Sequence, residues 1–132
     1  MILMIAAALL AQQSPEQEWH CDDPQNQAEM NMCAGFDCQR GDAELNRLWP
    51  QLIASARERD REVDRTYDTR QGYEATLRQA QRAWVSFRDE HCTWQGYEEA
   101  RGGTMEPMSY GACRAAVTRA RTAQLRGGEM EH

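Results

Sequence analysis

The stretch from Ala80 to Cys92 reads AQRAWVSFRDEHC and decides the fold class. At about 100° per residue, a helix here gathers apolar side chains on one face. These are Leu77, Ala80, Trp84, Val85 and Phe87. The same arc also holds Gln81, Arg88, His91 and Cys92. The period predicts a helix from about Gly72 to Tyr97, and the polar members of its stripe require an explanation.

The first thirteen residues, MILMIAAALLAQQ, are uncharged and mostly apolar. An apolar run of about ten residues is too short to span a bilayer but matches the apolar region of a signal peptide. We interpret residues 1–13 as a signal peptide, with a buried N-terminal helix as the alternative. Residues 14–132 are expected to form a single domain that is periplasmic or secreted, without stable membrane insertion after signal removal.

The chain carries a net charge of −6, and all fifteen of its cationic side chains are arginines. Binding to nucleic acid requires a basic surface that neutralises phosphates, so this charge argues against a nucleic-acid partner. An acidic protein attracts basic partners instead.

Helical signals continue on both sides of the opening stretch. Asn26, followed three residues later by Glu29, has the form of an N-cap, and the helix that follows places Cys38 toward a core. The helical period continues through Leu45, Leu48, Trp49, Leu52, Ile53 and Ala56. Pro50 predicts a kink or a helix restart. The almost fully charged residues 57–70 are interpreted as a solvated helix end and a connection.

The C-terminal part is expected to hold a loop and one more helix. Residues 101–112 contain three glycines and a proline, which predicts a loop. A last helix over about 113–126 would turn Ala116, Val117, Ala120 and Leu125 inward. This helix is rich in arginine, whereas residues 16–44 hold eight acidic side chains and one arginine, so packing the two together would balance their charge. Without any alternating strand pattern, the expected fold is all-α, a compact bundle of three to four helices.

Catalytic and metal sites find little support in the sequence. No Ser-His-Asp order, phosphate loop or nucleophile elbow is present, and a reactive Cys38 assisted by His91 lacks a third orienting group. A zinc site built from Cys33, Cys38, His91 and Cys92 lacks the tight ligand spacing of such sites. We therefore expect no enzymatic activity, no metal and no cofactor.

With these pieces placed, the chain resembles the LprI-like lysozyme inhibitor family, a group of small exported bacterial domains, from Cys21 to about Leu125. The most specific stretch is Ala80–Val85, followed by Phe87-Arg88-Asp89 and Cys92. The other matching pieces are Cys21, Glu29-Met30-Asn31, Cys33-Ala34, Asp42–Asn46, Gly102-Gly103, Cys113, Thr118, Arg121 and Leu125. The resemblance implies helices tied by disulfides and, for some members, inhibition of lysozyme.

Five cysteines behind an export signal favour structural disulfides. Cys38 is additional to the four cysteines usual in the family that this chain resembles. We expect bridges Cys21–Cys33 and Cys92–Cys113, with Cys38 left as a buried thiol. The second bridge would close the glycine-rich loop, and the loop-entropy model gives a stabilisation of roughly 3 kcal/mol for a loop of this size.

The polar stripe is explained by a partly buried seam between two helices. A guanidinium in such a seam requires a planar acceptor, and Asp42 is the first choice of partner for Arg88, with Glu44 the second. Gln81 and Asn46 would satisfy the remaining polar groups. The alternative is that this cluster contacts a ligand.

The expected function is protein binding, in which the domain inhibits a basic wall-degrading lysozyme. The alternative is an interaction or scaffold domain of the bacterial envelope with a different partner. The stretch 95–110 is the candidate contact, through Tyr97, Glu98, Glu99, Met105 and Tyr110. Aromatic anchors would hold the complex, and acidic groups would mainly accelerate encounter.

Overall fold

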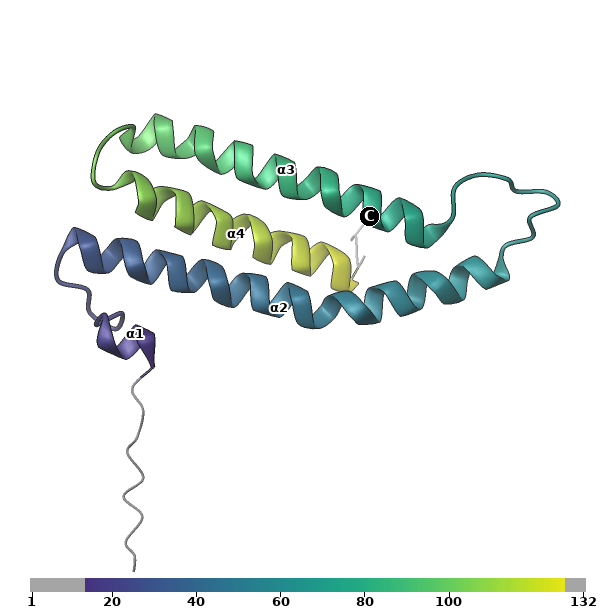
Figure 1. Ribbon diagram of the computed structural model, residues 1–132, viewed down its shortest axis with the longest axis horizontal. Helices are drawn as coiled ribbons and strands as arrows, with labels where there is room; N and C mark the ends of the chain where they lie inside the picture. Colours follow the sequence, from purple (N-terminus) through teal and green to yellow (C-terminus); the bar gives the residue numbers. More distant parts are fainter. Residues whose placement is uncertain (1–13, 128–132) are drawn as a thin grey trace, which may run out of the picture.

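Four helices make up the computed structural model of the protein, which describes residues 14–127 (Figure 1). They are α1 (Pro15–Glu18), α2 (Gln27–Glu62), α3 (Tyr73–Ala100) and α4 (Glu106–Gly127). No strand occurs among these residues, so the all-α prediction is confirmed. The expected signal peptide, residues 1–13, lies outside the described residues.

The long helices α2, α3 and α4 lie side by side (Figure 1). Helix α4 contacts α2 and α3 more extensively than these two contact each other. Ion pairs join α4 to the acidic first half of α2. Arg119 binds the Asp37 carboxylate at 2.6 and 3.0 Å, and Arg126 binds Glu44 at 2.6 Å. The predicted balance of charge between the two ends of the chain is therefore confirmed.

The N-terminus of α2 is capped as the sequence predicts, because the Asn26 side chain accepts a hydrogen bond from the backbone N–H of Glu29 at 2.9 Å. Pro50 lies inside α2, which continues through it to Glu62. The expected helix restart is therefore wrong. Figure 1 shows instead that α2 bends in its middle, as the missing N–H and the ring of an interior proline require.

The connection between α2 and α3 is held by a carboxylate from the end of α2. Gly72 has no side chain with which to cap α3. The Asp60 carboxylate accepts hydrogen bonds from the backbone N–H groups of Tyr73 at 2.6 Å and of Glu74 at 3.1 Å. The charged stretch 57–70 therefore forms a helix end and a connection, as expected, and also supplies the missing cap.

The turn between α3 and α4 is shorter than the sequence predicts. Residues 101–105 form the turn, with Gly102 at φ 76°, and α4 begins at Glu106. The expected loop over 101–112 is wrong in its second half. The Glu106 side chain accepts a hydrogen bond from the backbone N–H of Gly102 at 2.8 Å, which helps to start the helix early.

Two cysteine pairs, Cys21–Cys33 and Cys92–Cys113, lie at disulfide distance with Cα–Cα separations of 5.5 Å. The prediction of a helical bundle stapled by two disulfides is confirmed. Cys38 is a free buried thiol. Beside these sulfurs, the buried apolar side chains are few and mostly small: Leu45, Ile53, Ala56 and Ala115.

The inward face of α4 differs from the prediction. Ala116 and Ala120 are exposed, and Val117 and Leu125 are half-buried. The buried positions are Ser109, Gly111, Cys113, Ala115, Thr118 and Thr122. These small side chains let α4 approach α2 closely, and this close approach determines which face of α4 is buried.

Glycine substitutions test this close approach. A Cβ atom on Gly111 would lie 3.2–3.3 Å from backbone and side-chain atoms of Ala34, whereas a Cβ on Gly41 would meet its neighbours at 3.7–3.8 Å. Gly111→Ala should lower the free energy of unfolding by about 1–3 kcal/mol through overpacking. The matched control Gly41→Ala should be neutral or up to about 1 kcal/mol more stable, because alanine favours a helix. Urea titration measures both, and equal effects would contradict the close approach.

The free thiol offers a second test of the core. Cys38 is 6% exposed, and burial raises the pKa of its thiol, against the opposing positive charges of Arg114 and Arg88. A raised pKa leaves less thiolate, which is the reactive form. At pH 8, iodoacetamide should alkylate the folded protein at least about tenfold more slowly than the denatured protein with its disulfides intact. Equal rates would show that this part of the core is open.

Candidate functional site

Arg88 joins three helices from a position that is only 7% exposed. Its guanidinium donates to Asp42 of α2 at 3.2 Å, to Asp89 of its own helix at 2.9 Å and to the Thr118 hydroxyl of α4 at 3.4 Å. The Trp84 ring covers the guanidinium at 5.1 Å. A buried cation is tolerated when carboxylates and hydroxyls satisfy its donors, and here each long helix contributes an acceptor.

The inward face of α3 accordingly carries a buried cation, and several of the apolar side chains of α3 lie elsewhere. The buried residues of α3 are Arg88, Cys92 and Gly96. Leu77 and Trp84 are half-buried, but Ala80, Val85 and Phe87 are exposed, so their predicted inward orientation is wrong. The Arg88 guanidinium and the Cys92–Cys113 disulfide occupy the contact between α3 and α4, so these apolar side chains lie outside it.

The other residues expected in the polar seam, Gln81, Glu44 and Asn46, form no hydrogen bond with Arg88. The side-chain oxygen of Gln81 accepts from Arg121 of α4 at 3.0 Å, and burial lowers the pKa of that arginine. Glu44 pairs with Arg126 and so does not reach Arg88. Asn46 is exposed and lines the open side of the seam.

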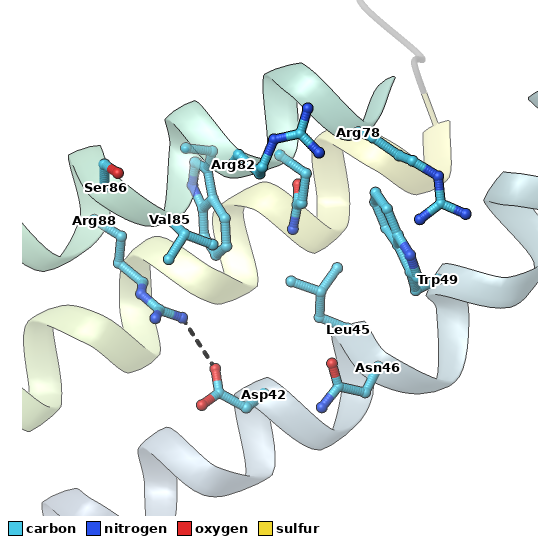
Figure 2. Close-up of a pocket in the computed structure, with 11 residues that line it drawn as sticks. Asp42, Leu45, Asn46, Trp49, Arg78, Arg82, Val85, Ser86 and Arg88 are labelled. Atoms are coloured by element: carbon cyan, nitrogen blue, oxygen red, sulfur yellow. Dashed lines mark hydrogen bonds and ion pairs between the residues drawn. The ribbon is translucent and has the colours of Figure 1, made fainter. Parts of the chain in front are cut away.

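The seam opens into a groove of about 740 Å³ between α2 and α3 (Figure 2). Figure 2 shows Leu45 pointing into this groove from α2 and the Arg88–Asp42 ion pair at one end. The remaining lining is contributed by Asn46, Trp49, Arg78, Gln81, Arg82, Trp84, Val85 and Ser86. The groove combines two indole rings with cationic groups, so it suits a ligand with an apolar body and an anionic group.

The predicted partner-binding stretch 95–110 gathers around the turn between α3 and α4. Tyr97 is 44% exposed and Met105 is 50% exposed, and Glu98 is exposed as well. Glu99 accepts a hydrogen bond from Ser109 of α4, and Tyr110 is half-buried under the guanidinium of Arg114. Four of the five residues, including Glu99, are therefore exposed, and Tyr110 is the half-buried one.

The outward face of α3 carries an aromatic row that the sequence pattern does not predict. Phe87, His91 and Trp94 lie along this face, with ring centroids 5.3 and 5.7 Å apart. Their spacing of four and three residues was visible in the sequence. The helical period gathers Phe87 and His91 with Leu77 and Trp84, so it predicts an inward position for these two residues, whereas Trp94 is not part of that stripe.

Neither a metal site nor a membrane span occurs in the described part of the chain. Residues 14–127 contain no group of three or more His, Cys, Asp or Glu side chains placed to hold a metal ion. Within the same residues, every helix is too polar or too short to cross a bilayer.

Comparison with known proteins supplies a family. A family model described as "Lysozyme inhibitor LprI" matches residues 21–125, which include both disulfides and nearly all of the three long helices. An uncharacterized protein of Rhizobium meliloti (strain 1021) is 38% identical over 125 residues, which cover 95% of this chain and 88% of that protein. No solved structure matches the chain.

A double-mutant cycle tests the role of Arg88. Arg88→Ala should lower the free energy of unfolding by about 2–4 kcal/mol, because it removes the shared donor of a largely buried ion pair. Asp42→Ala should cost about 1 kcal/mol, since Asp42 is 37% exposed at its side chain and Asp89 still binds Arg88. The double variant should cost clearly less than the sum of the single variants.

The exposed pair Glu58–Arg61 is the matched control for this cycle. Its coupling should stay within about 0.5 kcal/mol, as is usual for surface pairs. Additive effects of Arg88→Ala and Asp42→Ala in denaturant titrations would show that their contact contributes nothing to stability.

Proposed function

The chain belongs to the LprI lysozyme inhibitor family, and we propose on this basis that it is exported and inhibits a wall-degrading lysozyme. The observation that carries this proposal is the family match over residues 21–125. Export agrees with the two disulfides, since such bridges persist in oxidising compartments. Inhibition by binding requires no catalytic residue.

The charge of the chain supports a basic, animal-type lysozyme as the target. The net charge of −6 favours encounter with a positively charged protein. On the α2–α4 side, arginines already neutralise Asp37 and Glu44. On the α3 side, Glu90 and Glu98 are exposed, and these carboxylates are available to a basic partner.

The contact surface that we propose lies at the turn between α3 and α4. Tyr97 and Met105 offer exposed apolar surface there, and Glu98 offers a charge beside it. Glu99 is exposed beside them and accepts a hydrogen bond from Ser109, and the half-buried Tyr110 lies against Arg114. The Cys92–Cys113 disulfide ties the two helices beneath it, so little ordering entropy is lost on binding.

A second candidate function is that of an envelope interaction domain with a different partner. The groove between α2 and α3 favours it, because Trp49, Trp84 and Arg82 line an open space of about 740 Å³ there. A partner held in that groove would leave the turn between α3 and α4 free. Trp49 lines this groove from α2 and is not part of the stretch 95–110, so its substitution discriminates between the two functions.

A cell-wall turbidity assay tests the proposed inhibition. The domain in excess should slow lysis of bacterial cell walls by a basic animal-type lysozyme at low salt, and more weakly at high salt, because salt screens the acidic groups. Replacing Tyr97, Glu98, Glu99 and Met105 by alanine should weaken inhibition at least about tenfold.

The matched control replaces the same residue types at distant exposed positions, Met32, Glu58, Glu62 and Tyr67. It should inhibit as the unmodified chain does. Undiminished lysis at low salt would contradict the inhibitor function. Inhibition that survives the first quadruple variant, but not Trp49→Ala, would move the contact to the groove.

A further inference from the structure

The outward face of α3 presents more aromatic surface than a solvated helix requires. Phe87 and Trp94 are each 57% exposed, and the His91 ring lies between them. Positions i, i+4 and i+7 of a helix share one face, and this spacing is typical of helices that anchor in a partner. The core side of α3 carries Arg88 and Cys92. Phe87 and Trp94 therefore stay largely exposed, and His91 between them is half-buried.

A hollow of about 410 Å³ lies beside the row, formed by Asp89, Glu90, Thr93, Trp94 and Tyr97. Two of these residues are aromatic and two are acidic. Asp89 already faces Arg88 at 2.9 Å and Arg114 at 3.4 Å. Glu90 is exposed, and no cationic side chain of residues 14–127 pairs with it.

We propose that this hollow is a docking site for an arginine or lysine side chain of a basic protein partner. The cation would lie over the Trp94 ring and beside the Glu90 carboxylate, with its alkyl stem against the indole. The neighbouring row, Phe87 and His91, would bury apolar surface of the same partner. That this partner is a lysozyme rests on the proposed function. That the hollow binds a cationic side chain is argued from its own residues.

The chain itself contains the same type of contact. Arg101 lies over the Tyr97 ring at 4.4 Å, and Arg88 lies over Trp84 at 5.1 Å beside two carboxylates. Each of these two contacts sets a guanidinium against the face of an aromatic ring. Trp94 and Glu90 provide the ring and the carboxylate of such a contact, and the guanidinium is left for a partner.

Charge argues against a second copy of the chain on this face. A symmetric antiparallel pairing that sets Phe87 against Trp94 of another copy places the two-fold axis between Glu90 and His91. The Glu90 residues of the two copies would then be offset by only about 1.5 Å along the helix axes, and both would lie on the same side of the interface. Two like charges held close together disfavour that dimer, and a cationic partner does not meet this repulsion.

Titration with a blocked tetra-arginine peptide, followed by NMR of the isotopically labelled chain, tests the hollow without any lysozyme. The indole N–H resonance of Trp94 and the amide resonances of residues 89–97 should shift most. Glu90→Gln should weaken this binding at least about threefold, and the matched control Glu62→Gln should leave it unchanged. A tetra-glutamate peptide should cause no shift there. Shifts that avoid Trp94, or that are unaffected by Glu90→Gln, would overturn the proposal.

Binding to a basic animal-type lysozyme separates this inference from the proposed function. Replacing Phe87 and Trp94 by alanine should weaken that binding at least about tenfold. Full inhibition by this variant would overturn the docking site and leave the inhibitor function standing. Absence of lysozyme binding, with peptide shifts still centred on Trp94, would support the site and contradict the lysozyme partner. A chain that dimerises in sedimentation, and loses the dimer with Trp94→Ala, would assign the row to a second copy and overturn the proposal.

Discussion

The burial of one guanidinium organises the three long helices. Arg88 on α3 requires acceptors that water cannot supply at its depth, and Asp42 on α2 and Thr118 on α4 provide them with Asp89. Because these acceptors come from different helices, the guanidinium is satisfied only when all three are in register. Apolar contacts are non-directional, so they could not specify the register of such a thin core equally well.

Small side chains and disulfides complement this polar centre. Gly111 and Ala115 let α4 lie close against α2, where large side chains would hold the helices apart. The bundle consequently buries few large apolar groups. The Cys92–Cys113 bridge closes a separation of 21 residues, for which the loop-entropy model gives a stabilisation of roughly 3 kcal/mol. Crosslinks of this kind suit a small exported domain with a modest core.

Local signals in the sequence were sufficient for the fold class, whereas the packing direction of each helix was not readable from them. The cap at Asn26 and the helical period from Tyr73 depend on neighbouring residues only, so they were predictable. Phe87 and Ala116 were placed inward because hydrophobicity alone was used to choose the buried face. That choice depends on how closely α4 approaches its neighbours, which the sequence does not show directly. The same pattern predicts an inward position for Phe87 and His91, so it does not indicate the exposed row that they form with Trp94.

Arg88 and Cys92 occupy the inward face of α3, and Phe87 and Trp94 lie on its outside, where a partner can reach them. Hydrogen–deuterium exchange of the chain with and without excess basic lysozyme measures the location of the contact directly. We expect slower exchange in residues 87–106, which cover the row and the turn before α4, and unchanged exchange in residues 42–49 of the α2–α3 groove. Protection confined to residues 42–49 and 78–86 would contradict it, because the partner would then lie in the groove and not on the outward face of α3.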